Sequence, residues 1–291
     1  MGKDQSFFNI KNTLTCKGKL IDLKTPMVMG IINVTSDSFY GKSQFMMKRR
    51  ILKRAKQILT QGGKIIDVGA CSTRPGSMPI SENEELKRLE KALSVIRKHF
   101  PNEIISIDTF RASVAKRMVE DFDANIINDI SAGNMDKNMF ETIADLNVPY
   151  IAMHMQGTPE NMQNNPQYKD VIKDLFTFFS NKIEQLTRMG VKDVLIDPGF
   201  GFGKTLNHNY AILNNLDSFS IFNLPVVAGL SRKSMIYKPL NTDPKNALNG
   251  TTVLNTIALT KGAKVLRVHD VDEAIEAIKL TEIVLSQNKT N

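Results

Sequence analysis

Polar side chains stand at the ends of several short runs of branched apolar residues in this chain. The carboxylates Asp108 and Asp197 and the amide Asn128 each follow such a run directly. A carboxylate can hold the donor-rich edge of a nitrogen heterocycle through two charge-assisted hydrogen bonds. A single Asp at such a position often braces a fold or caps a helix. Three side chains directed at one opening therefore predict a binding site for a flat heterocycle.

Residues of a second kind indicate an anion. The last apolar run ends in Arg267-Val268-His269-Asp270. Arg267 offers a planar fork of donors for phosphate oxygens, and His269 can supply a hydrogen bond or a positive charge. A lone histidine equally often packs or caps, but a position two residues after Arg267, where a helix begins, favours anion binding. Together the two groups predict a ligand with a heterocyclic ring and a phosphate tail.

The elements that must position these residues alternate along the chain. Apolar runs predict eight strands at 28–32, 65–68, 104–107, 126–127, the run that ends before His154, 194–196, 226–227 and 265–266. Helical periodicity predicts eight helices over 46–59, 82–98, 113–121, 139–146, 171–189, 210–216, 247–260 and 272–285. Parallel strands that close into a barrel bring their polar ends to one face. We therefore predict the α/β class and a single (β/α)8 TIM barrel.

The N-terminal segment differs from the rest. Residues 7–23 alternate loosely around Lys17-Gly18, which predicts a short β-hairpin that caps the barrel floor. No stretch rich in Pro, Gly or Ser divides the remaining chain. The full length of 291 residues suits one barrel, for which about 250 is typical. The predicted units are a hairpin extension at 1–25, the barrel at 26–286 and a C-terminal tail at 287–291.

Two nucleotide-binding motifs fail in this chain. An open doubly wound sheet usually has Gly-x-Gly-x-x-Gly after its first strand, where this chain has Asn33-Val34-Thr35-Ser36-Asp37. The glycine-rich segment 199–205 lacks the first glycine of a P-loop, because Pro198 stands there, and Lys204 replaces the third glycine of the dinucleotide motif. We expect these glycines to let the backbone pass close to a flat ligand beside Asp197, with a purely structural loop as the alternative.

The bulk composition argues against several classes of protein. Hydrophobic residues at 42% and charged residues at 23% describe an ordinary globular protein. The net charge of +8 is spread along the chain, and its one cluster at 48–54 begins an amphipathic helix, so we expect a solvated face and no nucleic acid. No apolar run approaches about 18 residues, so we expect no membrane span. Cys16 and Cys71 form no CxxC pattern, which argues against zinc and disulfides and favours the cytoplasm.

Three histidines and one aspartate receive structural interpretations. His99, His154 and His208 show no metal-ligand spacing, and His154 is expected to shape the barrel rim. Asp67 lies inside the second apolar run. We expect it to support a strand-end residue rather than to act in catalysis.

The strings around these positions resemble the dihydropteroate synthases. The resemblance extends from about Pro26 to Glu282 and rests on several motifs in the family's order. They are Gly30-Ile31-Ile32-Asn33-Val34-Thr35 with Asp37-Ser38-Phe39, Asp67-Val68-Gly69 with Ser72-Thr73-Arg74-Pro75-Gly76, Ser106-Ile107-Asp108-Thr109 with Arg111, Ile127-Asn128-Asp129-Ile130-Ser131, Met153-His154-Met155 with Gly157-Thr158-Pro159, Asp197-Pro198-Gly199 through Lys204-Thr205, Ser231-Arg232-Lys233-Ser234 and Arg267-Val268-His269-Asp270.

Members of this family are enzymes that join 4-aminobenzoate to (7,8-dihydropterin-6-yl)methyl diphosphate and release pyrophosphate, as a step of folate synthesis. The resemblance implies this transferase activity, small-molecule substrates, Mg²⁺ as cofactor and a homodimer. It also implies a division of roles among the motif residues. The pterin would be held by Asp108, Asn128, Asp197, Lys233 and Arg267.

The remaining roles are implied in the same way. The diphosphate would be held by Asn33, Arg267 and His269, with Asn33 also close to the metal ion. The 4-aminobenzoate would be held by Thr73, Arg74, Pro75, Phe202, Lys233 and Ser234. The implied catalytic residues are Asn33, Asp37, Lys233, Arg267 and His269.

The chain departs from the family pattern in two loops that are expected to close over the substrates. Ser36 stands where the family usually has Pro, and Gly41-Lys42-Ser43 replaces an Asp-Gly-Gly-like turn. Ala70 and Cys71 replace a Gly and a larger or acidic residue. Loop closure and the response to inhibitors are the properties that these positions affect.

Two rival functions share part of the pattern. A methyltransferase acting on methyltetrahydrofolate would use the same Asp and Asn site, with less need for Ser231-Arg232-Lys233-Ser234 together with Arg267-Val268-His269. An inactive pterin-binding module would be expected to have lost Asn33, Arg267 or His269, and all three are present. The residues therefore favour the synthase.

Overall fold

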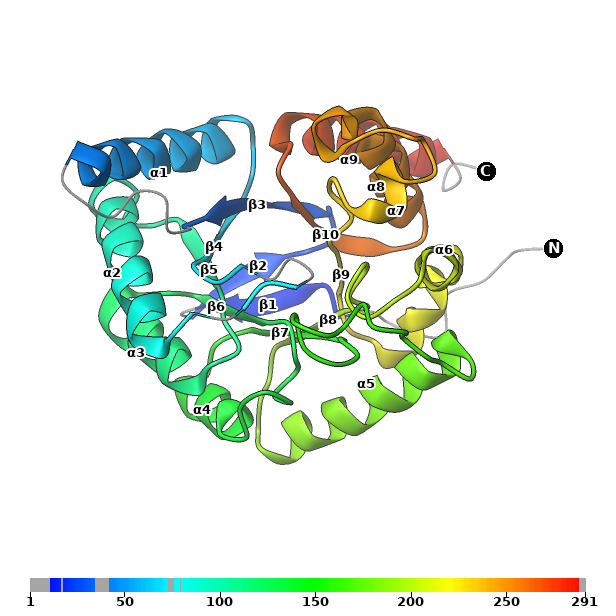
Figure 1. Ribbon diagram of the computed structural model, residues 1–291, viewed down its shortest axis with the longest axis horizontal. Coiled ribbons are helices and arrows are strands. Elements are labelled where there is room, and N and C mark those ends of the chain that lie inside the picture. Colours follow the sequence, from blue (N-terminus) through cyan, green and yellow to red (C-terminus); the bar gives the residue numbers. More distant parts are fainter. Residues whose placement is uncertain (1–10, 17, 35–41, 73–75, 79, 288–291) are drawn as a thin grey trace.

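The computed structural model describes residues 11–16, 18–34, 42–72, 76–78 and 80–287. Within them, eight parallel strands close into a barrel in the order β10-β3-β4-β5-β6-β7-β8-β9, with helices around it (Figure 1). The barrel strands are β3 (Met27–Asn33), β4 (Ile65–Gly69), β5 (Ile104–Asp108), β6 (Ile126–Asp129), β7 (Tyr150–Met153), β8 (Val194–Asp197), β9 (Val226–Ala228) and β10 (Ala263–Val268). The predicted barrel is confirmed.

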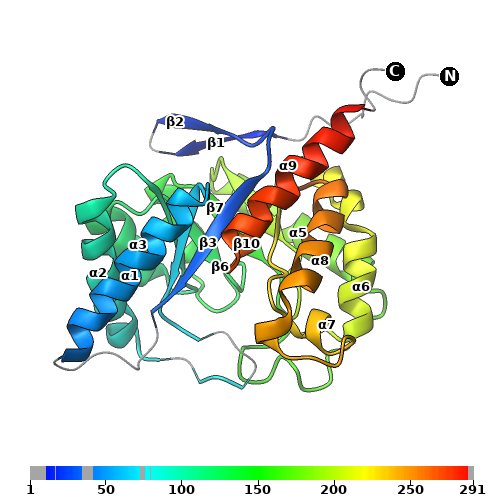
Figure 2. The same ribbon diagram turned by 90° about the horizontal axis from the view of Figure 1, so that it is seen from above.

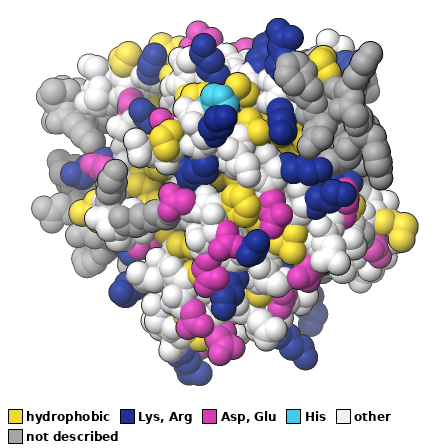
Figure 3. Space-filling model, turned by 90° about the vertical axis from the view of Figure 1, so that its left-hand side faces the viewer, with side chains coloured by type: hydrophobic (Ala, Val, Ile, Leu, Met, Phe, Trp, Pro, Cys, Tyr) yellow, Lys and Arg dark blue, Asp and Glu magenta, His cyan; other side chains and the backbone are white. Residues whose placement is uncertain are grey.

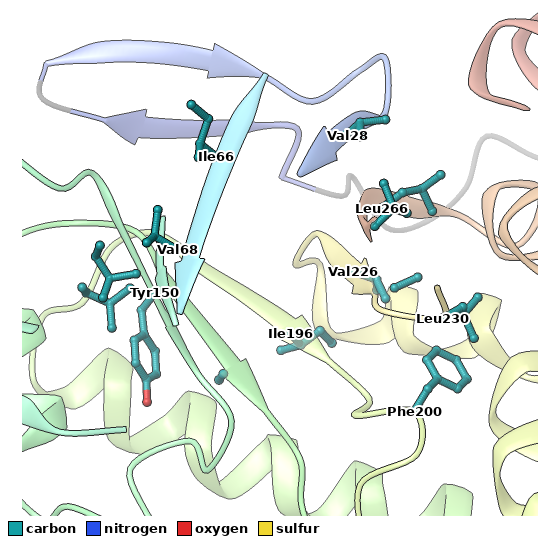
Figure 4. Close-up of a cluster of buried hydrophobic side chains, with 14 of the residues drawn as sticks. Val28, Ile66, Val68, Tyr150, Ile196, Phe200, Val226, Leu230 and Leu266 are labelled. Carbon is teal, nitrogen blue, oxygen red and sulfur yellow. The ribbon is translucent and has the colours of Figure 1, made fainter. Parts of the chain in front are cut away.

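The side chains of each strand alternate between the barrel interior and the surrounding helices. On β4, Ile66 and Val68 lie in the apolar cluster drawn in Figure 4, which also contains helix residues such as Leu89. Because successive side chains of a strand point to opposite faces, Asp67 between them points into the barrel. The strand therefore buries a carboxylate where an apolar run would otherwise fill the interior.

The strand register brings the polar strand ends to one level. Asn33 pairs with Gly69, Gly69 with Asp108, and Asp108 with Asn128. Since all the barrel strands run parallel, these residues share its carboxyl edge, where the side chains of barrel enzymes meet their substrates. Asp197 ends β8 at the same edge.

Helices cover the outside of the barrel. They are α1 (Lys42–Thr60), α2 (Glu82–His99), α3 (Ala112–Phe122), α4 (Met139–Leu146), α5 (Val171–Arg188), α6 (Leu206–Asn214), α7 (Ser234–Tyr237), α8 (Leu248–Thr260) and α9 (Val271–Gln287), with 3-10 turns η1 (Leu216–Phe222) and η2 (Pro244–Asn246). Local signals fix several starts, because the side chains of Ser81 and Asp170 cap α2 and α5.

Helix α6 differs from its predicted range of 210–216. A capping box between Thr205 and His208 starts the helix at Leu206, and at Asn214 it gives way to the tighter η1. The fourth residue of this box is His rather than the usual Glu or Gln, so the sequence does not display the familiar signature. His208 is accordingly a capping residue.

The predicted N-terminal hairpin is present and closes the barrel floor. Strands β1 (Thr13–Cys16) and β2 (Lys19–Asp22) lie across one end of the barrel, and β3 runs away from them (Figure 2). Four hairpin side chains pack on the interior residues of the lowest barrel layer. The cluster contains Leu14, Cys16, Ile21 and Leu23 with Met29, Ile65, Ile126, Ile151, Leu195, Val227 and Val265. This apolar plug leaves the carboxyl edge as the open end.

Charges of both signs are mixed on one face of the molecule. On the face shown in Figure 3, Lys and Arg side chains are interspersed with Asp and Glu. On α3, for example, Lys116 and Arg117 pair with Glu120 and Asp121 one turn away. None of the helices in the described ranges is long and apolar enough to span a membrane.

Candidate active site

Arg267 joins two buried carboxylates inside the mouth of the barrel. Its Nε and Nη2 atoms lie 2.7 Å from Asp67 Oδ2, and Nη2 also lies 2.6 Å from Asp108 Oδ2. Burial alone would lower the pKa of Arg267, but the charges of Asp67 and Asp108 outweigh it and raise that pKa. The expectation that Asp67 supports a strand-end residue is confirmed, since it holds Arg267.

Asp108 is poised between its two protonation states. Burial raises the pKa of its carboxyl, Arg267 lowers it, and the nearby charge of Asp67 raises it again, to about 7. The direction of the shift makes the protonated form, which can donate a hydrogen bond, more accessible than it is for an exposed aspartate. Asn128, buried on the neighbouring strand and paired with Asp108 in register, offers both a donor and an acceptor beside it.

Asp197 and Lys233 form a second pair across the mouth. Asp197 Oδ1 accepts the Gly199 N–H at 2.7 Å. A Cβ atom added to Gly229 would lie 3.6 Å from Lys233 Nζ and 3.7 Å from Asp197 Oδ2, so both groups border this glycine. Burial lowers the pKa of Lys233 to about 8, although the charge of Asp197 opposes the shift. Burial also raises the pKa of Asp197, against the charge of Lys233.

Lys233 also contacts the glycine-rich segment after β8. Its Nζ donates to the Phe200 carbonyl and lies 4.7 Å from the centre of the Phe202 ring. Phe202 packs with Met153, Met155 and neighbouring apolar residues at the rim. The Phe202 ring thus forms an apolar wall next to the Lys233 ammonium.

His269 is fixed by the loop that follows β9. Ser231 Oγ accepts the His269 backbone N–H at 3.2 Å and lies 3.1 Å from its Nδ1 atom. The Ser231 proton is then available to Nδ1, which leaves the ring proton on Nε2. Loss of water around the ring and the positive charge of Arg267 lower the pKa of His269 to about 4. In the free protein this histidine is therefore a neutral hydrogen-bond donor at neutral pH, and not the positive charge that was the other predicted possibility.

An ion pair ties the same two loops together. Arg232 Nε and Nη2 each lie 2.8 Å from an oxygen of Asp270, in the parallel geometry that a guanidinium and a carboxylate favour. Arg232 itself has a φ of 57°, in the left-handed region. The pair therefore holds a bend that places Lys233 on one side and His269 on the other.

Asn33 ends β3 with an exposed side chain at the mouth. An amide oxygen is a hard donor that suits Mg²⁺, which commonly takes one or two protein ligands beside substrate phosphates. In the parts of the chain that the structure describes, no group of three His, Cys, Asp or Glu side chains could hold a metal ion. Asn33 supplies one amide oxygen of the kind that such an ion takes.

Several predicted residues lie outside the described residues. They are Asp37, Thr73, Arg74 and Pro75, together with the family departures Ser36 and Gly41. Ser234 is described, and it begins α7. Ala70 is buried, and burial together with Glu85 raises the pKa of the Cys71 thiol to about 12, so that thiol stays protonated.

Glu85 and Lys204 are buried charged residues that were given no role from the sequence. Glu85 on α2 accepts the Thr109 hydroxyl at 2.6 Å and pairs with Arg111, so it joins the roots of the loops after β4 and β5. Lys204 is buried among carbonyl groups after β8. The available signal for Glu85 was its position four residues before Leu89, on the apolar face of its helix.

The chain matches known proteins over nearly all of its length. A family model described as pterin binding enzyme matches residues 29–269. Dihydropteroate synthase of Escherichia coli is 41% identical over 276 residues, which are 94% of this chain and 96% of the relative. The Haemophilus influenzae enzyme of the same name is 39% identical over 92% of this chain and 97% of its own.

Solved structures agree with these sequence matches. A Yersinia pestis dihydropteroate synthase in complex with a sulfonamide drug superposes with a TM-score of 0.88 at 39% identity, over 94% of this chain and 99% of that one. A Xanthomonas albilineans dihydropteroate synthase with 4-aminobenzoic acid has a TM-score of 0.86 at 32% identity, over 94% and 98%. The chain therefore belongs to the pterin-binding enzymes and, within them, to the dihydropteroate synthases.

Proposed function

We propose that the open end of the barrel joins (7,8-dihydropterin-6-yl)methyl diphosphate to 4-aminobenzoate with loss of pyrophosphate. One observation carries the proposal: acceptors and donors for a pterin, and donors for an anion, lie around a single mouth. Asp108 and Asp197 face the ring edge, while Arg267 and His269 stand on the side where a diphosphate would lie. This arrangement supports a reaction in which the bond between the methylene carbon and the diphosphate breaks.

The pterin is assigned to Asp108, Asn128, Asp197 and Lys233. A carboxylate with raised pKa can receive the donor edge of the ring without the full penalty of a buried charge. Lys233, whose pKa of about 8 leaves it mostly protonated at neutral pH, donates to a ring acceptor. Together these groups hold the ring so that its exocyclic methylene faces the outer half of the mouth.

The leaving group is assigned to Arg267, His269 and Asn33. As the carbon–oxygen bond breaks, negative charge gathers on the diphosphate, and donors already held in place stabilise it. Arg267 stays charged throughout, and the Nε2–H of neutral His269 adds a directed hydrogen bond. Mg²⁺, held by Asn33 and the diphosphate oxygens, would neutralise further charge on the leaving group.

The second substrate is assigned to Phe202, Lys233 and Ser234, with Thr73, Arg74 and Pro75 from the second loop. Asp37 from the first loop is assigned to catalysis. Phe202 packs against the aryl ring, and the start of α7 at Ser234 faces the benzoate carboxylate. The neutral amine then needs only to be positioned for attack on the methylene carbon, after which it loses a proton to water.

A pyrophosphate-release assay with single omissions tests the function. We expect release only when Mg²⁺, the pterin diphosphate and 4-aminobenzoate are all present. Asp197→Asn should weaken binding of both the pterin diphosphate and the unphosphorylated pterin, measured by calorimetry. No release from the complete mixture would refute the enzyme assignment, and unchanged pterin affinity in Asp197→Asn would refute the role of that carboxylate.

We further infer that two copies of the chain pair through α8 and α9, which contact each other. Exposed apolar side chains line these helices: Val253, Ile257, Leu280, Ile283 and Val284. Such a cluster is more than the scattered apolar side chains that a monomer exposes. Light scattering should give twice the mass of the chain, and Leu280→Glu should shift it to the mass of one copy.

A cytoplasmic location, with small-molecule substrates and neither nucleic acid nor membrane as partner, completes the proposal. It is supported by two cysteines with no pairing pattern and by the mixed surface charge. Fractionation of cells that express a tagged chain should recover it with the cytoplasmic proteins; recovery with membranes would refute this part.

A further inference from the structure

Lys204 is a buried lysine that none of the assigned roles uses. Its side chain is 3% exposed, and four acceptors surround its Nζ atom. They are His154 Nδ1 at 2.9 Å, the His154 carbonyl at 3.2 Å, the Gly199 carbonyl at 3.0 Å and the Phe202 carbonyl at 3.0 Å. Burying an ammonium group is unfavourable unless acceptors bind its protons. The four acceptors therefore explain how Lys204 can be buried.

The surroundings define the protonation of both side chains. Burial and then the charge of Lys204 lower the pKa of His154 to about 2, so its ring is neutral. Burial lowers the pKa of Lys204 as well, but four acceptors call for the three N–H donors of an ammonium. Nδ1 of His154 therefore accepts, and the ring proton lies on Nε2.

The segment 199–203 depends on side chains for its shape. Each of its five carbonyls accepts from one: Lys204 donates to Gly199 and Phe202, Lys233 to Phe200, Gln163 to Gly201 and Tyr168 to Gly203. The segment forms neither strand nor helix. The Gly199 carbonyl also accepts the Phe202 N–H at 3.1 Å, but the other carbonyls of the segment depend on these side chains.

Two glycines press this segment against the chain that follows β7. Gly199 and Gly203 have φ of 71° and 59°. A Cβ atom at Gly199 would lie 1.9 Å from the His154 carbonyl, and one at Gly203 would lie 2.4 Å from the Gln156 carbonyl. The glycines thus allow the close approach, and the Lys204 ammonium bridges the carbonyls that meet there.

We propose that Lys204 and His154 are positioning residues for the 4-aminobenzoate subsite. The ammonium fixes the Phe202 carbonyl, and with it the ring that forms one wall of that subsite. This inference rests on the proposed function, because it assigns the wall to the second substrate.

Two substitutions separate this role from simple packing. Lys204→Met keeps the volume of the side chain and removes its charge, whereas Lys204→Ala leaves a space lined by acceptors. Binding is measured by calorimetry for 6-hydroxymethyl-7,8-dihydropterin and for pteroate, which adds the aminobenzoate group. We expect both variants to bind pteroate roughly 10- to 100-fold more weakly while pterin binding changes less than about threefold. Lys169→Met, an exposed lysine on the connection after β7, is the matched control and should leave both affinities unchanged.

A rescue experiment tests the charge directly. Ammonium or methylammonium chloride should restore pteroate binding to Lys204→Ala but not to Lys204→Met, whose side chain fills the space. Tetramethylammonium chloride, too large and without N–H donors, should restore neither. Equal losses of pterin and pteroate binding, or no rescue of a folded Lys204→Ala, would overturn the proposal.

Nuclear magnetic resonance of the His154 ring covers the case in which Lys204→Ala does not fold. In the wild type, the ¹⁵N shift of Nδ1 should be that of an unprotonated acceptor throughout the stable pH range, and Lys204→Met should change it. An Nδ1–H tautomer in the wild type would overturn the proposal. A wild type that binds pterin and pteroate but releases no pyrophosphate would refute the proposed function and leave this geometry standing.

Discussion

Asp108 and Asp129 are buried carboxylates at the ends of neighbouring strands, and they differ in what occupies their oxygens. Asp129 accepts four hydrogen bonds of 2.7–2.8 Å: from the Ser131 N–H and hydroxyl, the Gly133 N–H and the Tyr150 hydroxyl. Asp108 accepts only from Arg267 among the described residues. Asp129 is saturated by the protein, whereas Asp108 keeps acceptor capacity for a ligand.

The pKa shifts of Asp129 and Asp108 differ in the same way as their hydrogen bonds. Burial raises the pKa of both carboxyls. For Asp129, hydrogen bonds from the protein oppose the shift. For Asp108 the main opposition is the charge of Arg267, which Asp67 shares, and Asp67 Oδ1 has no hydrogen-bond partner among the described residues. A buried acid that the fold leaves partly unsatisfied marks a site, and one that the fold satisfies marks a brace.

The largest effect is expected from Arg267→Ala. It leaves Asp67 and Asp108 buried without their cation and removes an anion contact, so pyrophosphate release should fall by roughly 10³-fold. Lys keeps the charge but not the fork that reaches both carboxylates, so Arg267→Lys should be intermediate. Calorimetry should show a greater loss for the pterin diphosphate than for the unphosphorylated pterin. Equal losses would contradict the anion-binding role of this side chain.

Asp129→Asn tests the carboxylate whose hydrogen bonds are all supplied by the protein. An amide cannot accept from four donors, so we expect a loss of about 2–4 kcal/mol in the free energy of unfolding. The melting temperature measured by thermal unfolding should fall by about 5–10 °C. The variant that still folds should bind pterin with wild-type affinity, and a selective loss of binding would show that Asp129 belongs to the site.

Asp108→Asn should give the reverse result. Losing a charge-assisted contact to the ring should weaken pterin binding roughly 10- to 100-fold. The melting temperature should not fall by more than about 2 °C, because burial raises the pKa of Asp108, so its ionised form is a net cost to stability in the free protein at neutral pH. A large fall in melting temperature with intact binding would assign Asp108 to the braces.

The smallest effect concerns a proton. His269 has a pKa of about 4 in the free protein, and a bound diphosphate should raise it, because negative charge favours the imidazolium. Between the two values the complex holds more protons than the free protein, so binding takes up protons and affinity falls as pH rises. Calorimetry near pH 5.5 in two buffers should detect an uptake of about 0.2–0.8 proton. In His269→Gln this proton uptake should disappear. An unchanged proton uptake would exclude His269 as its source.

The sequence predicted the barrel, its hairpin and the level at which the polar residues meet. This succeeded because parallel strands leave long apolar runs and because each run ends where the chain turns to solvent. Helix α6 was predicted less well, since its capping box uses His208 in place of Glu or Gln.

The contacts of the site were predicted only in part. That Asp67 would support another residue followed from its place inside an apolar run, but its partner lies 200 positions away and could not be named. The role of Lys204 gave no signal, because its acceptors, three backbone carbonyls and the His154 ring, come together only after the loop has folded. The roles carried over by resemblance for Asp37, Thr73, Arg74 and Pro75 stay predictions.

The hairpin beneath the barrel has a kinetic consequence. Because an apolar plug seals one end of the barrel, substrates and products must all pass through the open carboxyl end. On the proposed assignments, the pterin ring beside Asp108 lies deeper in the mouth than 4-aminobenzoate against Phe202, so we expect the pterin diphosphate to bind first. The single entrance of the barrel would then set the order in which the substrates bind. It would also make the joined product, whose ring lies deepest, the last molecule to leave.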